Sequence, residues 1–434
     1  MTHTNGASRT LSVASLARVE GEGSMHVVVR DGQVHDVQLR IFEPPRFFEA
    51  FLRGRAFGEL PDITARICGI CPVAYQMSAC QAIEDACGVD VPAPVRALRR
   101  LLYCGEWIES HALHIYLLHA PDFLGYESSI HLAHDHRDIV ERGLKLKKVG
   151  NDILNVLGGR AIHPVNVRVG GFYRAPAKEE FDTLAERLRW ARDAAVETAQ
   201  WVSGFEFPDL ELEGDLVALH SDSEYAINDG RIASTSGLDI AVGEFPEHFA
   251  EEHVAHSTAL HGHLRDGGTY TLGPISRYNL NHDQLPAMAK QVASDIGLGQ
   301  TCRNPFKSIM IRAVEVVFAC DEALRIIASY ERPPAPSAQV TVRAGTGHGC
   351  TEAPRGSLYH RYTIDAQGVI ADAVIVPPTS QNQPSIELGL RSFVQDRLDL
   401  DDAELTRQCE QAIRNYDPCI SCATHFLDLT VDRG

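Results

Sequence analysis

The residues of this chain best suited to chemistry are two pairs of cysteines near opposite ends of the sequence. Cys68 and Cys71 form one C-x-x-C motif, and Cys419 and Cys422 form the other. Two intervening residues allow the backbone to curl around a metal, so each pair can direct two thiolates at one point. Soft sulfur ligands select zinc, copper(I), iron–sulfur clusters or another soft transition metal. The two pairs together predict a four-thiolate metal site.

The separation of the two pairs indicates a reaction centre. A zinc ribbon brings its pairs within about 15–20 residues of each other, whereas here most of the chain lies between them. A site that requires the whole chain to fold around it is predicted to be buried. The alternative from the cysteines alone is a non-catalytic protein with a four-cysteine zinc site.

Composition narrows the class of protein. The 434 residues are 44% hydrophobic and carry a formal net charge of −18, which argues against a nucleic-acid partner. An odd count of 11 cysteines in a long chain does not suit a disulfide framework, so a reducing cytoplasm is expected. Neither a signal peptide nor an apolar run of transmembrane length is recognised. No phosphate-binding glycine motif occurs, so a nicotinamide or flavin would have to bind another subunit.

The elements that must position the cysteines follow from periodicity and turn residues. Two β-hairpins are expected, over 25–41 with a turn at Asp31-Gly32 and over 357–376 after a glycine-rich loop at 345–356. Helical spacing predicts long helices over 73–85, 96–120, 138–157, 178–204, 283–296, 308–330 and 403–416. We expect an α+β fold: a large core of long helices with peripheral antiparallel β hairpins, in one interlocked unit over 1–434. The metal site would be buried between the N- and C-terminal motifs.

Several histidines could be metal ligands, and the sequence does not decide whether they are. His111 and His114 share one face of an expected helix, but no third ligand is recognised nearby. His131, His134 and His136 cluster in a stretch expected to be a polar, solvated loop.

Five motifs in order resemble those of the nickel–iron hydrogenase large subunit. They run from residue 18 to residue 425 and are R-V-E-G, R-I-C-G-I-C-P, E-A-P-R-G, P-T-S-Q-N and D-P-C-I-S-C-A-T-H. The resemblance implies a hydrogenase that converts H2 reversibly to two protons and two electrons. It also implies nickel bound by all four cysteines, with Cys68 and Cys419 terminal and Cys71 and Cys422 shared with an iron that carries carbon monoxide and cyanide.

The same resemblance assigns further site residues. The proton from heterolytic cleavage would reach the Cys419 sulfur and then Glu20. Arg355 would lie over the iron and its diatomic ligands, Thr379 would hydrogen-bond one cyanide, and Asp122 would lie close to that arginine. Without the resemblance, Glu20 and Arg355 are surface charges and Asp122 is a turn residue.

A magnesium site is the second metal that the resemblance implies. Its ligands would be Glu49, the backbone oxygen of Ile375 or a neighbour, and His425; without the resemblance, Glu49 pairs with Arg53 or Arg55. A maturation protease would remove residues 426–434 after His425. Two positions depart from a common family pattern, because Tyr75 and Glu22 stand where many relatives have histidine.

Electrons need a route out, and no further cysteines have the spacing of an iron–sulfur cluster. A small subunit with iron–sulfur clusters is therefore expected. The chain resembles the cytoplasmic NAD(P)-linked and sulfhydrogenase group, which implies NAD(P)-binding flavin and iron–sulfur subunits as further partners. The alternative within the superfamily is a hydrogen-sensing regulatory subunit. The non-catalytic alternatives are the four-cysteine zinc protein and a scaffold like the quinone-site subunit of respiratory complex I.

Overall fold

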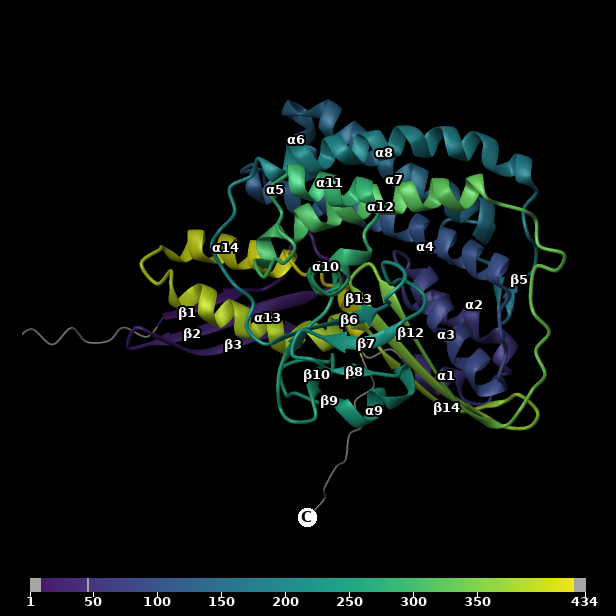
Figure 1. Ribbon diagram of the computed structural model, residues 1–434. Coiled ribbons are helices and arrows are strands. Elements are labelled where there is room, and N and C mark those ends of the chain that lie inside the picture. The colour runs from purple at the N-terminus through teal and green to yellow at the C-terminus, as the bar shows by residue number, and fades with distance from the viewer. Residues whose placement is uncertain (1–8, 45–46, 425–434) are drawn as a thin grey trace, which may run out of the picture.

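Long helices form the centre of the computed structural model, which describes residues 9–44 and 47–424. Four of them lie side by side in Figure 1, and α4 contacts both α7 and α12 while α12 also contacts α8. Their bounds are α4 (Ala93–Leu113), α7 (Arg137–Gly158), α8 (Asp182–Ser203) and α12 (Ser308–Ala328). The helix expected over 96–120 is divided: α4 is followed by a π-helical segment, His114–His119, and by α5 (Ala120–Phe123). The mixed fold predicted from the sequence is confirmed.

The first expected hairpin is confirmed as part of a three-stranded antiparallel sheet. Its strands are β1 (Arg9–Val13), β2 (Gly23–Arg30) and β3 (Gln33–Ile41). Asp31 and Gly32 have φ values of 52° and 71°, the positive angles that a tight two-residue hairpin turn requires. Figure 1 shows this sheet beside α13 (Pro378–Gln395) and α14 (Asp402–Arg414), so an N-terminal and a C-terminal part of the described residues pack together.

The stretch expected to be a glycine-rich loop is instead a strand, which corrects the prediction. Strand β12 (Gly345–Ala353) pairs with β13 (Gly356–Ile364), and β13 pairs with β14 (Ile370–Val376). A Cβ atom on Gly347 would lie 2.0 Å from the Ala82 carbonyl oxygen, and one on Gly349 would lie 2.2 Å from that of Ser78. The glycines therefore allow β12 to lie directly against α3 (Pro72–Cys87).

The remaining elements surround this framework. A four-stranded sheet has the order β11-β6-β7-β8, and its β11–β6 pair is parallel, unlike the antiparallel hairpins expected. His131 and His134 lie in a short helix, α6, which corrects the prediction of a loop. The other bounds are α1 (Phe48–Leu52), α2 (Leu60–Thr64), β4 (Val167–Arg168), β5 (Gly171–Phe172), α6 (Ser129–Asp135), β6 (Asp215–His220), β7 (Arg231–Ser234), β8 (Asp239–Ile240), α9 (Phe245–His248), β9 (Phe249–Glu252), β10 (His261–Leu264), β11 (Tyr270–Thr271), α10 (Pro274–Asn281), α11 (Ala287–Asp295) and α15 (Ile420–Ala423).

The two cysteine motifs meet because backbone segments from both ends pair directly. Glu20 and Cys419 form a parallel β-bridge, and the amide of Ile420 donates to the carbonyl oxygen of Glu20 at 2.9 Å. Cys68 ends a short helical turn that leads into α3, and Cys419 immediately precedes α15. Among the described residues, no helix combines the length and apolar character needed to cross a membrane.

Candidate metal centre

All four motif cysteines converge in the interior. Their Sγ atoms lie within 4.8 Å of one another and all four residues are buried. The Sγ atom of Cys419 is 3.6 Å from that of Cys68 and 2.6 Å from that of Cys422, longer than the roughly 2.0 Å of a disulfide. All 11 cysteines of the chain lie within the described residues, and each of them is free and buried. This agrees with the sequence, whose cysteine count does not suit a disulfide framework.

The surroundings of these sulfurs favour a bound soft metal. The amides of Ile70 and Cys71 donate to the Cys68 sulfur at 3.3 and 3.2 Å. Burial by itself raises the pKa of Cys68, but hydrogen bonds with Cys419 and Cys422 hold its pKa well below the usual value, whereas hydrogen bonds with Cys422 and Cys68 raise the pKa of Cys419 well above it. A metal deprotonates coordinating thiols outright, so four sulfurs within reach of one ion in a water-poor site suit nickel and iron.

Glu20 is the acid that the structure brings to this centre. Its Oε2 atom lies 3.1 Å from the Cys419 sulfur and accepts a hydrogen bond from the amide of Ser421 at 3.0 Å. The residue is half-buried, whereas Cys419 is buried. Glu20 therefore connects a buried sulfur with the outer part of the molecule, which is the position a proton relay needs.

Arg355 lies at the same centre and pairs with an acid that the sequence did not indicate. Its Nε atom donates to the backbone oxygen of Asp417 at 2.7 Å, and its Nη2 atom donates to Asp417 Oδ1 at 3.1 Å. Both residues are buried. Burial alone lowers the pKa of Arg355, but the charges of Asp417 and Cys419 raise it well above the ordinary value, so the guanidinium stays charged.

One atom of Arg355 fits a ligand of the metal centre. Its buried Nη1 has no hydrogen-bond partner among the described residues. Buried polar atoms are almost always hydrogen-bonded, so a lone donor of this kind calls for an explanation. An iron-bound cyanide would accept such a hydrogen bond.

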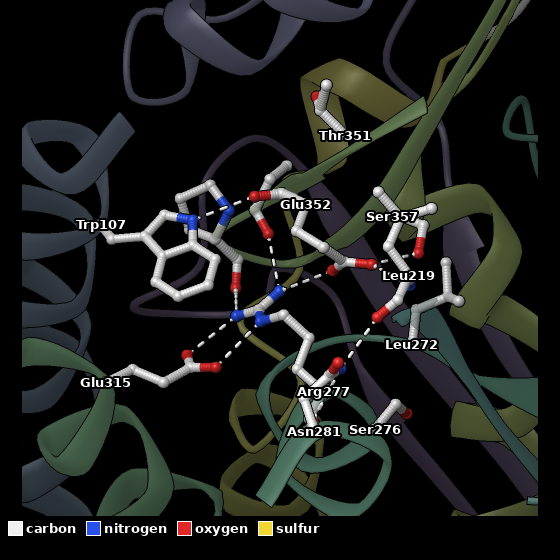
Figure 2. Close-up of polar contacts among 12 residues, drawn as sticks. Trp107, Leu219, Leu272, Ser276, Arg277, Asn281, Glu315, Thr351, Glu352 and Ser357 are labelled. Carbon is white, nitrogen blue, oxygen red and sulfur yellow. Dashed lines mark hydrogen bonds and ion pairs between the residues drawn. The ribbon is translucent and has the colours of Figure 1, made fainter. Parts of the chain in front are cut away.

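A second arginine fixes the backbone that carries Arg355. Figure 2 shows Arg277 of α10 between two acids: Nε and Nη2 each donate to Glu315 at 2.9 Å, and Nη1 donates to Glu352 at 3.0 Å. Trp107 donates to the backbone oxygen of Glu352 at 2.9 Å. These side chains lie in the interior, where a paired and fully hydrogen-bonded arrangement is required.

The same guanidinium also holds the turn between β12 and β13. It donates to the carbonyl oxygens of Ala353 and Pro354 at 2.8 and 3.0 Å. Because these two residues immediately precede Arg355, the network sets the direction in which Arg355 leaves the sheet. No local pattern in the sequence marks Arg277, whose partners lie 38 and 75 positions away.

Thr379 lies at the start of α13, beside the second cysteine pair. Its Oγ1 atom accepts a hydrogen bond from the Cys419 amide at 3.1 Å, and the side chain is buried. Since this bond uses the oxygen as acceptor, the hydroxyl hydrogen is available to donate to a ligand at the centre.

Asp122 is paired with two arginines other than Arg355. It accepts hydrogen bonds from Arg414 Nε and Nη2 at 2.7 and 2.8 Å, and it also pairs with Arg18. The acid that pairs with Arg355 is Asp417. Asp122 therefore attaches the segment that leads into Glu20, and its closeness to Arg355 stays a prediction.

We expect Asp122→Asn to destabilise the chain by about 3–5 kcal/mol at neutral pH, because it leaves buried Arg414 without its counter-charge. Burial raises the pKa of Asp122, but hydrogen bonds with Arg414 and its charge outweigh this and lower the pKa. The contribution of ionised Asp122 to the free energy of unfolding is therefore complete above the unfolded-state pKa of about 3.9. It is lost as pH falls through the lower folded-state pKa of the same carboxyl group. Denaturant unfolding from pH 7 to pH 3 should show the difference between the two proteins shrinking on acidification. A difference that stays constant with pH would contradict this role.

The residues proposed for magnesium are brought together in part. The amide of Ile375 donates to Glu49 Oε1 at 2.7 Å. Both residues line a cavity of 460 Å³ that also borders Cys422 and Thr424. Arg53, one alternative partner considered for Glu49, pairs with Asp372 at 3.1 Å. His425 lies outside the described residues.

Two histidines considered as metal ligands are hydrogen-bonded to protein groups, and Tyr75 lies beside the cysteines. Nε2 of His111 is 2.8 Å from Glu315 Oε2, and Nε2 of His114 is 2.8 Å from the Arg414 carbonyl oxygen, so each is hydrogen-bonded to protein.

Tyr75 is buried with its ring 5.7 Å from that of His360, and its hydroxyl has no partner among the described residues. Burial and then the charge of Cys422 raise the Tyr75 pKa, so it faces the cysteines as a neutral phenol.

Comparison with known proteins agrees with this geometry. The family model described as nickel-dependent hydrogenase matches residues 46–141 and 328–425. Sulfhydrogenase 1 subunit alpha of Pyrococcus furiosus is 34% identical over 96% of this chain and 98% of its own. NAD-reducing hydrogenase HoxS subunit beta of Cupriavidus necator is 26% identical over 97% of this chain and 95% of its own. The crystal structure of an NAD+-reducing nickel–iron hydrogenase in the H2-reduced state superposes with a TM-score of 0.87 at 25% identity, covering 97% of this chain and all of that one.

Proposed function

The chain belongs to the nickel-dependent hydrogenase family, and we propose that it is a catalytic subunit whose four motif cysteines hold a nickel–iron centre for reversible H2 conversion. The observation that carries this proposal is the buried set of four converging sulfurs with Glu20 Oε2 3.1 Å from one of them. When bound, the nickel–iron pair, with carbon monoxide and cyanide on the iron, supplies the activation of H2 and receives its electrons. The cysteines themselves are Cys68, Cys71, Cys419 and Cys422.

Proton movement is the part of the reaction that this chain's own groups perform. The Cys419 sulfur accepts the proton, and Glu20 takes it because its carboxylate lies within hydrogen-bond distance. Ser421 fixes Glu20 beside a second carboxylate: its amide donates to Glu20 Oε2 at 3.0 Å, and its hydroxyl donates to Glu43 Oε1 at 3.2 Å. The step from Cys419 to Glu20 leads the proton away from the buried centre.

Arg355 and Thr379 would hold the ligands of the iron. The Arg355 guanidinium is fixed by Asp417 on one side and presents Nη1 on the other. Thr379 is fixed by the Cys419 amide and presents its hydroxyl hydrogen. Fixed donors in a site without bulk water stabilise negative charge strongly, because no reorganisation is needed.

We also propose magnesium at Glu49, the backbone oxygen of Ile375 and His425, next to the second cysteine pair. Oxygen ligands suit this ion, which keeps several waters. Removal of residues 426–434 by a maturation protease would then make His425 the new C-terminus. The chain would act as one interlocked unit over 1–434 until that cleavage.

The proposed partners are a small subunit with iron–sulfur clusters and NAD(P)-binding flavin and iron–sulfur subunits in the cytoplasm. Support comes from the relatives that are named as sulfhydrogenase and NAD-reducing hydrogenase subunits. None of the seven cysteines outside the motifs joins a metal-binding group among the described residues, so electrons need a second protein.

The test is the metal content and infrared spectrum of the chain purified with its native partners. We expect one nickel and one iron at the cysteine site, with absorption bands of carbon monoxide and cyanide. H2-dependent NAD(P) reduction by the same preparation tests the electron acceptor separately from the metal centre. A slow rate of H2 turnover would indicate a hydrogen-sensing regulatory subunit in place of a catalytic one. Zinc alone, without those bands after co-expression with the maturation machinery, would overturn the proposal.

A further inference from the structure

A second cluster of metal-ligating side chains lies outside the cysteine centre. It consists of His256 in the connection between β9 and β10, His261 at the start of β10, and Glu387 in α13. One ligand atom from each lies within 4.8 Å of the others. Besides the four cysteines, this is the only group of this kind among the residues that the structure describes.

The ion pair between His256 and Glu387 leaves one residue of the cluster, His261, without a hydrogen-bond partner at Nε2 among the described residues. His261 is 4% exposed. Its ring centroid lies 5.4 Å from that of His256. A buried imidazole nitrogen is expected to have a partner, and the two groups beside it are another imidazole and a carboxylate.

Glu387 is held in position by contacts from two other segments. Its Oε1 atom accepts a hydrogen bond from the Leu39 amide at 2.8 Å and lies 2.9 Å from His256 Nε2. Both contacts use the same oxygen, so Oε2 is available to a cation. The side chains of His256 and Glu387 are 21% and 17% exposed, which lets an ion arrive from solvent.

We propose that His256, His261 and Glu387 bind one divalent transition-metal cation. Two imidazoles and one carboxylate are the donor set that Zn²⁺ and its neighbours prefer, whereas Mg²⁺ and Ca²⁺ select oxygen ligands. Donor atoms within 4.8 Å can surround an ion at about 2.0–2.2 Å after small side-chain rotations. The site differs from the magnesium site proposed above, with which it shares no residue.

The ion would act as a clamp on the connection between β9 and β10. Between the two histidines, Ala259 forms an antiparallel bridge with Thr424, and the Thr258 amide donates to the Ile41 carbonyl oxygen at 2.8 Å. The clamp would therefore join α13, β3 and the end of the segment that carries the second cysteine pair. Glu387 lies eight residues after Thr379 on α13, about 12 Å further along the helix axis, so the two metal centres are separate.

The test uses the mature hydrogenase complex, dialysed against a chelator and checked for retained nickel, and then equilibrated with Zn²⁺. We expect wild type to take up one additional ion per chain. His256→Gln and Glu387→Gln should bind it more than roughly 100-fold more weakly, since loss of even an outer-shell partner costs 10–100-fold. His282→Gln is the matched control, because His282 is 16% exposed and pairs with one carboxylate, that of Asp283.

Co²⁺ identifies the ligands of the added ion. In wild type we expect weak visible bands without sulfur-to-cobalt charge transfer, and neither substituted protein should show them. Equal Zn²⁺ uptake by wild type and Glu387→Gln, no uptake by wild type, or a charge-transfer band from sulfur would overturn the proposal. Should Glu387→Gln fold poorly, the partly exposed His256→Gln decides. Nickel content and the infrared bands should be unchanged in these variants, which separates this result from a failure of the proposed hydrogenase function.

Discussion

Replacing Glu20 with glutamine is expected to lower the rate of H2 oxidation by about 10²–10⁴-fold while nickel and iron remain bound. Glutamine keeps the shape of the side chain and can still accept the hydrogen bond from the Ser421 amide. It cannot take the proton from the Cys419 sulfur, which lies 3.1 Å from the carboxylate in the native chain. The effect should therefore fall on proton transfer and not on assembly of the centre.

The measurement is H2 oxidation with an artificial electron acceptor, together with metal content and infrared spectrum. Glu22→Gln is the matched control, since Glu22 lies two residues away on the same segment but is exposed. This control should keep the wild-type rate, and Glu20→Asp should fall between wild type and Glu20→Gln. A Glu20→Gln protein with full metal content and a rate within about twofold of wild type would exclude the proposed relay.

Replacing Arg355 with lysine is expected to lower turnover by about 10²–10³-fold, the usual effect of removing a fixed donor from a charge-stabilising site. The native guanidinium donates to the backbone and the side chain of Asp417 and still presents Nη1. A lysine ammonium keeps the charge but cannot reproduce this forked geometry. Lysine is preferred to a neutral residue, because loss of the charge would leave buried Asp417 unpaired at a cost of about 3–5 kcal/mol.

Arg361→Lys provides the control for the arginine prediction. Arg361 lies on β13, is 31% exposed and pairs with Asp372 at 3.0 Å, so the same substitution there should leave turnover unchanged. The infrared bands of the cyanide ligands should move in Arg355→Lys and stay in place in Arg361→Lys. Wild-type bands and turnover in Arg355→Lys would show that Arg355 does not contact the iron ligands.

The sequence by itself determined the features that depend on residue type and short spacing. The two C-x-x-C motifs predicted a buried site of four thiolates, because cysteine chemistry and a two-residue gap define the donor set locally. Helical spacing and turn residues such as Asp31-Gly32 predicted the long helices and the hairpins, since both depend on neighbours in the chain. The segments that form α6 and β12 were predicted to be loops. The reason is that polar residues and glycines occur in loops with the same local pattern as in these two elements.

Only the tertiary structure decided which distant charges pair. Asp417 is the partner of Arg355, Asp122 pairs with Arg414, and Arg277 reaches acids on α12 and β12. His256, His261 and Glu387 meet because α13 packs against β10, a contact between segments more than 100 residues apart. Such pairs form where desolvation makes an unpaired charge costly, and that condition is set by packing of the whole chain, which no local pattern in the sequence records.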